Sequence, residues 1–314
     1  MISLSSSGGY PMAKKFTNPN PNHYGRVFSD PYRSRRGVGP RRPPQPLPRV
    51  TPDFREPVDG ISMVWLGHSS VLLRMGGKTI LIDPIFSRWV SPVPFVGPRR
   101  FPGETVTPSQ LPEVDLVLIT HNHYDHCDKA TLRALDGQVK GYLAPTGVGR
   151  IIQSFGIQSS KIQELGWYEE TAMDDLKIIC TPSQHNSSRT GIDWNRTLWC
   201  SYVLRDGTHT VFNSGDGGFG AHFEEIRARY GSPDLAIMEC GQYGERWHTT
   251  HMFPEESVQA CRILGARLAV PVHWGAYCLS DHPWDDPPRR FRQRALELKQ
   301  PFHIPTLNEV ITLK

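Results

Sequence analysis

The chain has 314 residues, of which 38% are hydrophobic, and this is enough apolar material for the core of a globular protein. It contains no run of about 18 apolar residues and no signal-peptide segment, so we expect no membrane-spanning helix and a cytoplasmic location, with peripheral membrane contact left open. The six cysteines occur singly, without CxxC pairs, which predicts reduced thiols and excludes a disulfide framework.

The positive charge of the chain is unevenly distributed. The formal net charge of +4 is too small to require a polyanionic partner, and we expect no nucleic-acid ligand. Basic residues nevertheless gather ahead of the first predicted strand, namely Lys14, Lys15, Arg26, Arg33, Arg35, Arg36, Arg41, Arg42 and Arg49. This asymmetry marks the N-terminal region as different from the rest of the chain.

Residues 1–58 combine these bases with serine, glycine, asparagine and proline, a composition that favours extended chain over a packed core. We interpret them as an N-terminal arm, either a solvated tail or a strap that packs on the domain. Contact with anionic lipid or nucleic acid is the alternative. Residues 59–314 are then expected to form one folded domain.

Short apolar runs separated by turn residues begin near residue 61 and predict strands. The predicted strands are 63–66, 71–73, 79–83, 116–120, 176–181, 198–204, 209–213, 235–238 and 268–273, with Gly76 and Gly77 as a hairpin turn. Helical periodicity predicts helices at 128–135, 146–155, 221–230, 254–264 and 287–298. Because strands and helices alternate in two successive sets, we expect two sheets packed face to face with helices outside.

The predicted strand 116–120 leads directly into a cluster of metal-ligand side chains, His121, His123, Asp125 and His126. Loops at the edge of a sheet are where rigid scaffolds display functional groups. Four such side chains within six residues would be costly to bury without partners. A bound metal ion removes that cost, so the segment predicts a metal site.

This HxHxDH pattern resembles the hallmark of the metallo-β-lactamase superfamily. The resemblance implies an α+β fold, a four-layer αββα sandwich with a two-metal site at its edge. Three further candidate ligands, His185, Asp216 and His273, each follow a predicted strand.

By resemblance, one metal is held by His121, His123 and His185, the other by Asp125, His126 and His273, and Asp216 bridges them. Imidazole and carboxylate without thiolate fit two zinc ions, with iron or manganese as alternatives. A hydroxide that bridges the metals would then be the nucleophile of a hydrolytic reaction.

Segments 65–71, 82–87, 97–101, 181–185 and 273–275 narrow the resemblance to the phospholipases D that hydrolyse N-acyl-phosphatidylethanolamine and their bacterial relatives. A histidine at the position of His251 faces the substrate in that family. We therefore expect Asp125 and His251 to be catalytic, His251 by protonating the leaving alkoxide or holding the phosphate, with helix capping as its alternative.

Three more polar residues are expected near this site. Asp83 follows a strand and is a candidate acceptor for a ligand imidazole. His68 has either a similar role or a purely structural one. Glu239 is expected near the entrance of the site.

The segment 86–101 mixes apolar residues with arginines in a stretch that prolines break. Contact with a lipid surface and burial beneath the N-terminal arm explain this composition equally well. The segment and the basic arm are therefore candidate membrane contacts.

The leading hypothesis is a phospholipase D-type phosphodiesterase, zinc-dependent, acting on N-acyl-phosphatidylethanolamine-like phospholipids. A lactonase or other carbonyl hydrolase would use the same nucleophile on carbon. A non-catalytic metal-binding or scaffold protein is the alternative of another class. The sequence leaves the oligomeric state open, with a homodimer as one option.

Overall fold

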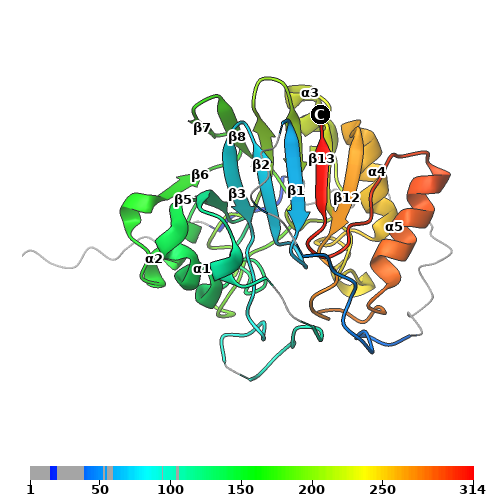
Figure 1. The fold of residues 1–314 in the computed structure, drawn as a ribbon, viewed down its shortest axis with the longest axis horizontal. Helices are drawn as coiled ribbons and strands as arrows, with labels where there is room; N and C mark the ends of the chain where they lie inside the picture. The colour runs from blue at the N-terminus through cyan, green and yellow to red at the C-terminus, as the bar shows by residue number, and fades with distance from the viewer. Residues whose placement is uncertain (1–14, 20–38, 52–53, 55–58, 94, 104–105) are drawn as a thin grey trace, which may run out of the picture.

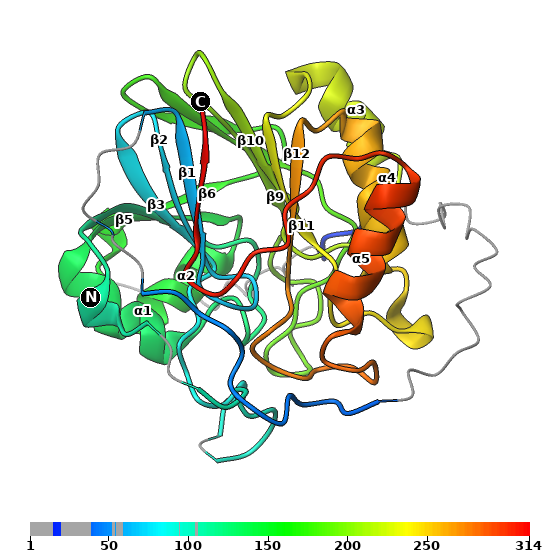
Figure 2. The same cartoon turned by 45° about the vertical axis from the view of Figure 1, so that its right-hand side comes forward.

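A computed structural model of the chain describes residues 15–19, 39–51, 54, 59–93, 95–103 and 106–314. Its strands form two sheets packed face to face, and helices cover the outer side of each sheet (Figures 1 and 2). This arrangement confirms the α+β, four-layer αββα sandwich expected from the sequence. Within the described residues, no helix has both the length and the apolar composition needed to cross a bilayer.

The first sheet has seven strands in the order β13-β1-β2-β3-β4-β5-β6. They are β1 (Ile61–Trp65), β2 (Val71–Met75), β3 (Lys78–Ile82), β4 (Val114–Leu118), β5 (Val139–Pro145), β6 (Ile162–Leu165) and β13 (Val310–Leu313). Strands β3 to β6 are parallel, whereas β13, β1, β2 and β3 pair antiparallel. The C-terminal strand thus returns to complete the sheet that the first strands began.

The second sheet has six strands in the order β12-β11-β10-β9-β8-β7. They are β7 (Glu170–Met173), β8 (Leu176–Thr181), β9 (Ser201–Arg205), β10 (Thr210–Asn213), β11 (Leu235–Glu239) and β12 (Leu268–Val272). Strands β10 to β12 are parallel and the others antiparallel. Pro271 lies in β12, an edge strand, where a residue without an N–H is tolerated.

Helices α1 (Lys129–Leu135) and α2 (Val148–Ser154) cover the first sheet, and α3 (His222–Tyr230), α4 (Pro254–Leu264) and α5 (Asp286–Glu297) cover the second (Figure 2). Short 3₁₀ turns occur at Pro108–Gln110, Asp136–Gln138, Ser159–Lys161 and Glu245–Trp247.

The alternation of side chains along each strand divides the core into layers. Ile61, Met63 and Trp65 of β1 face the second sheet, whereas Val64 packs on the side of α1 and α2. Successive residues of a strand point to opposite faces, and here both faces are apolar because both are covered. The buried apolar side chains therefore fix how the two sheets pack against each other. They also fix the position of the sheet edge at which the polar candidate residues lie.

All predicted strands and helices overlap observed ones, and Gly76 and Gly77 form the hairpin turn with φ of 57° and 68°. Four strands were not predicted. Strand β5 contains Gly141 and Pro145, and the short strands β6, β7 and β13 expose part of their length. Their pairing is set by neighbouring strands more than by their own apolar pattern.

Parts of the N-terminal arm pack on the domain. The N–H of Val50 donates to the carbonyl of Leu307 at 2.9 Å, and the N–H of Phe16 donates to the carbonyl of Asn195 at 2.9 Å. These contacts favour the strap interpretation for 15–19 and 39–51. Lys14, Arg26, Arg33, Arg35 and Arg36 lie outside the described residues, and the domain boundary near residue 58 stays a prediction.

Candidate metal centre

The ends of strands from both sheets bring the predicted ligands to one edge of the sandwich. The loop after β4 carries the 121–126 cluster, and His185, Asp216 and His273 follow β8, β10 and β12. The strands that carry these loops run in the same direction within each sheet, so their C-terminal ends lie at the same edge.

Three imidazole nitrogens converge in the first group of ligands, which we call the histidine triad: His121, His123 and His185. The Nδ1 atom of His123 lies 2.9 Å from Nε2 of His121 and 3.2 Å from Nε2 of His185. The Nδ1–H of His185 donates to the carbonyl of Thr250 at 2.8 Å, which turns its Nε2 toward the other two rings. Three nitrogen lone pairs therefore face one point.

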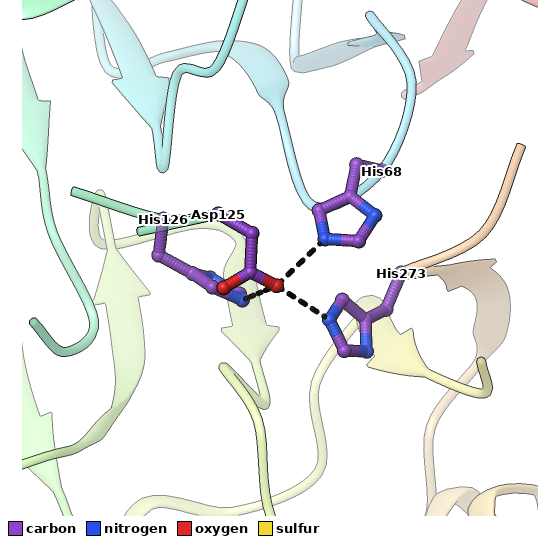
Figure 3. Close-up of side chains that lie close together, drawn as sticks. All are labelled: His68, Asp125, His126 and His273. Atoms are coloured by element: carbon purple, nitrogen blue, oxygen red, sulfur yellow. Dashed lines mark hydrogen bonds and ion pairs between the residues drawn. The ribbon is translucent and has the colours of Figure 1, made fainter. Parts of the chain in front are cut away.

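The second group combines a carboxylate with imidazoles and is shown in Figure 3: His68, Asp125, His126 and His273. Asp125 Oδ2 lies 2.9 Å from Nε2 of His68, 3.4 Å from that of His126 and 3.5 Å from that of His273. The ligand atoms of the group all lie within 4.8 Å of one another. His68 thus joins this group, although its sequence context left its role open.

Asp216 lies between the two groups. Its Oδ2 atom is 3.0 Å from Nε2 of His126 and 3.3 Å from that of His273. The same oxygen is 3.8 Å from Nε2 of His121 and 4.0 Å from that of His185. This is the position expected of a residue that bridges two ions.

The protonation of the histidine triad suits metal binding. Burial lowers the pKa of His123 to about 4 and holds those of His121 and His185 well below their usual value, with repulsion between the imidazoles adding to the effect for the latter two. All three rings are therefore neutral at neutral pH and keep a lone pair for a cation.

The second group is rich in negative charge. Burial opposes ionisation of Asp125 and Asp216, but His126 and the other histidines hold the pKa of both carboxyls well below the usual range. Burial likewise lowers the pKa of His126, yet Asp216, Asp125 and Asp83 raise it well above its ordinary value. Three carboxylates around one imidazole form a site that a divalent cation would neutralise.

Unpaired buried atoms give an independent test of whether metal ions fit. Oδ1 of Asp216 is buried without a hydrogen-bond partner, and Nε2 of His126, although 3.0 Å from Asp216 Oδ2, forms no hydrogen bond of acceptable geometry. Such atoms are costly in a protein interior unless a ligand satisfies them. The donor set of imidazole nitrogens and carboxylate oxygens, with no thiolate, suits zinc, iron or manganese. The residues present therefore fit two metal ions.

A hydrogen-bond chain fixes the orientation of ligands in both groups. Asp83 Oδ2 accepts from Nδ1–H of His126 at 2.8 Å and from the hydroxyl of Thr120 at 2.6 Å. The Thr120 oxygen in turn lies 2.9 Å from Nδ1 of His121, and Asp83 Oδ1 accepts from the Thr120 N–H at 2.8 Å. The expected contact of Asp83 with a histidine is therefore confirmed. These hydrogen bonds engage Nδ1 of His126 and of His121 and leave Nε2 of both rings directed at the metal centre.

Glu239 lies in the centre itself, not at its entrance as expected, because the end of β11 is buried between the neighbouring strands. Its Oε2 atom lies 3.0 Å from Nδ1 of His251, and its Oε1 accepts from the N–H groups of Gly217 and Met252, both at 3.0 Å. Burial lowers the pKa of His251, but the Glu239 carboxylate outweighs this and raises it. Burial raises the pKa of Glu239.

His251 does not cap helix α4, which was the alternative to a substrate-facing role. The N–H of Phe253 pairs with Oε2 of Glu256 at 3.0 Å, so the helix start is satisfied by its own glutamate. The ring of His251 instead stacks on that of His273 with centroids 5.4 Å apart. It is partly exposed, with 15% of its side chain accessible. His251 therefore lies beside the proposed ligands and still reaches solvent.

The segment 86–101 divides into a base that packs against the arm and a tip that is exposed, and contact with a lipid surface stays a prediction. Phe101 is buried, and Arg42 of the arm donates to the carbonyls of Arg99 and Arg100 at 2.6 and 2.7 Å. Val93, Phe95 and Val96 are 52%, 80% and 56% exposed. The arm thus covers the base of the segment and leaves its tip in solvent.

A family model described as the Beta-lactamase superfamily domain matches residues 78–274. An uncharacterised protein of Mycobacterium tuberculosis is 37% identical over 84% of this chain and 71% of its own length. The N-acyl-phosphatidylethanolamine-hydrolyzing phospholipase D 1 of Caenorhabditis elegans is 30% identical over 74% of this chain and 68% of its own. The corresponding mitochondrial enzyme of Saccharomyces cerevisiae is 34% identical over 74% and 51%.

Solved structures share the fold at lower identity. An isothiocyanate hydrolase from Delia radicum gut bacteria aligns with a TM-score of 0.63 and 21% identity, covering 81% of this chain and 99% of its own. CmlA, a diiron β-hydroxylase from Streptomyces venezuelae, aligns with a TM-score of 0.60 and 21% identity over 82% and 55%. These similarities support the αββα architecture around the described centre.

Proposed function

This chain belongs to the metallo-β-lactamase superfamily and is a metal-dependent hydrolase, and from that premise we propose that it is a phospholipase D-type phosphodiesterase. Its proposed substrates are phospholipids like N-acyl-phosphatidylethanolamine, the lipid named for the relatives from C. elegans and S. cerevisiae. The observation that carries the proposal is the position of Asp216 Oδ2 between two groups of ligand atoms.

We assign one metal ion to His121, His123 and His185, and a second to Asp125, His126 and His273, with Asp216 shared. Zinc is the proposed metal, and iron or manganese would suit the same donors. When bound, two such ions activate a water molecule and stabilise the negative charge that develops on the phosphoryl oxygens.

Asp125 is proposed both to bind a metal ion and to position the imidazole rings around it. Its Oδ2 atom is the point at which His68, His126 and His273 meet (Figure 3). Burial lowers the pKa of His68 to about 4, so its ring is neutral and its Nε2–H can donate to this carboxylate. His68 thus holds Asp125 in place while Asp83 holds His126.

His251 is proposed as the proton donor to the leaving group. Its Nδ1 is committed to Glu239, which the N–H groups of Gly217 and Met252 anchor in turn. Nε2 is then the nitrogen left to face a substrate. General acid catalysis by a positioned side chain contributes roughly 10²–10⁴-fold to a rate.

The proposed reaction adds the oxygen of water to phosphorus and breaks the bond from phosphorus to the ethanolamine oxygen. His251 gives its proton to the departing alkoxide as that bond breaks; one proton of the water stays with the phosphate product, and the other restores His251. The products are phosphatidic acid and an N-acylethanolamine.

The test is turnover of N-acyl-phosphatidylethanolamine vesicles by purified protein whose metal content is measured in parallel. We expect two metal ions per chain, release of phosphatidic acid, loss of release after treatment with a chelator, and recovery when metal is restored. Comparing zinc, iron(II) and manganese in the recovery step identifies the metal. Protein that carries two ions, leaves these vesicles unchanged and opens lactones would instead be the carbonyl hydrolase.

A further inference from the structure

A second polar site lies outside the metal centre, where segment 39–51 meets the loop that follows β3. It is a pocket of about 580 Å³. Four arginines and two phenylalanines contribute to its lining: Arg42, Arg88, Arg99, Arg100, Phe86 and Phe101. Among the described residues that line it there is no aspartate or glutamate. The described part of the lining therefore concentrates positive charge without an acidic side chain.

Two of these arginines are held by neutral acceptors. Arg100 donates from Nε to the hydroxyl of Tyr277 at 3.1 Å and from a terminal nitrogen to the carbonyl of Ile85. Arg42 donates to the carbonyls of Arg99 and Arg100. These bonds fix the guanidinium groups but leave their charge in place.

The other two, Arg88 and Arg99, are exposed and form no ion pair with any described residue. Four guanidinium groups around one pocket repel one another, and an anion would relieve that repulsion. The planar fork of a guanidinium matches the oxygens of a phosphate group. The pocket is thus suited to a phosphate-bearing ligand.

The same loop presents an apolar surface next to these arginines. The bridge between Trp89 and Arg99, with the N–H of Val90 bonded to the carbonyl of Pro98 at 2.9 Å, closes it into a hairpin. Val93, Phe95 and Val96, which we call the apolar tip, lie beyond this bridge and are largely exposed. Contiguous exposed apolar side chains rimmed by polar ones mark an interaction surface.

We propose that the arginine pocket and the apolar tip form a membrane-docking site that binds the phosphate of an anionic phospholipid while the tip enters the acyl layer. A soluble phosphate would occupy the pocket but leave the tip in water. A phospholipid is the ligand that offers a phosphate and apolar chains together. The docking site is separate from the metal centre, and the proposal does not depend on which reaction the metal centre catalyses.

The side chain of Tyr277 lies between the docking site and the metal centre. The guanidinium carbon of Arg100 is 4.8 Å from the centroid of the Tyr277 ring, and that ring meets His68 edge-on at 5.3 Å. Docking would therefore bring the proposed catalytic edge of the sandwich to the lipid surface.

The experiment is flotation of the full-length metal-loaded protein with vesicles of phosphatidylcholine, with and without phosphatidylglycerol. We expect binding that requires phosphatidylglycerol and weakens as salt rises. The double variant Arg88→Gln, Arg99→Gln should bind roughly 30-fold more weakly, because two arginines no longer meet the anionic surface. Phe95→Ser should weaken binding about tenfold through loss of apolar burial.

The matched control is Arg133→Gln, Arg150→Gln, which removes two exposed arginines of helices α1 and α2. It should keep nearly wild-type binding, and equal losses in both double variants would overturn the proposal by showing unspecific attraction. Vesicle binding that Phe95→Ser leaves unchanged would refute insertion of the tip. Saturable binding of inorganic phosphate without any vesicle binding would assign the pocket to a soluble ligand and refute the lipid.

Discussion

Asp83→Asn should weaken metal binding although Asp83 is not a proposed ligand. The carboxylate accepts three hydrogen bonds, from His126 and from the N–H and hydroxyl of Thr120. An asparagine has one acceptor oxygen, so either orientation of the amide sets its NH₂ against a buried donor. An unsatisfied buried donor costs about 1–3 kcal/mol, and a bond to a charged acceptor is worth about 1.5–3 kcal/mol. At 1.4 kcal/mol per tenfold change, we expect roughly 10–100-fold weaker metal affinity.

The assay is competition for metal with a chromophoric chelator, with folding of each variant checked by circular dichroism. The loss should be larger for the ion assigned to Asp125, His126 and His273, because Asp83 touches His126 directly and reaches His121 only through Thr120. Asp234→Asn is the control, since Asp234 also accepts a backbone N–H, from Thr210 at 2.9 Å, but at the opposite end of β11. A folded Asp83→Asn protein with unchanged affinity for both ions would show that Asp83 does not orient the proposed ligands.

Asp216→Asn should abolish turnover and reduce metal content, and unchanged turnover would contradict the bridging assignment. His251→Ala should retain its metal while kcat falls by roughly 100-fold or more, whereas loss of metal would show that His251 is a ligand. His222, outside the centre, has a pKa lowered to about 3 by burial, so protonation of the unfolded chain destabilises the fold as pH falls below about 6.5. Between pH 7 and pH 5, the free energy of unfolding of His222→Leu should therefore fall by about 2 kcal/mol less than that of the wild type. Urea unfolding at each pH measures this difference, and parallel pH profiles of the two proteins would contradict the prediction.

The two-sheet architecture could be predicted because its central strands carry strong local signals. Apolar runs such as 79–82 and 116–119 are bounded by turn residues, and the helices show clear periodicity. Strands β6 and β7 could not be predicted in this way, since they are short, partly exposed and rich in polar residues. Their assignment depends on pairing with β5 and β8, which no local pattern encodes.

The 121–126 cluster could be predicted because its ligand-type side chains lie close together directly after a strand. His185, Asp216 and His273 lie singly after strands, and their proposed roles came from the family resemblance. The side chains that orient them were harder to place. His68 is far from the 121–126 cluster in the chain, and only the fold brings its Nε2 within 2.9 Å of Asp125. Glu239 offers one carboxylate at the end of an apolar strand, and its burial beside His251 follows from the packing of β11 between β10 and β12.

In the proposed mechanism, water attacks phosphorus at the two-metal centre. The most direct test is hydrolysis of N-acyl-phosphatidylethanolamine vesicles in water labelled with a heavy oxygen isotope. The products are separated, and mass spectrometry locates the label. We predict that the label enters the phosphate of phosphatidic acid and is absent from the N-acylethanolamine. Label in a released fatty acid, or in the hydroxyl of the N-acylethanolamine, would show attack on carbon and contradict this mechanism.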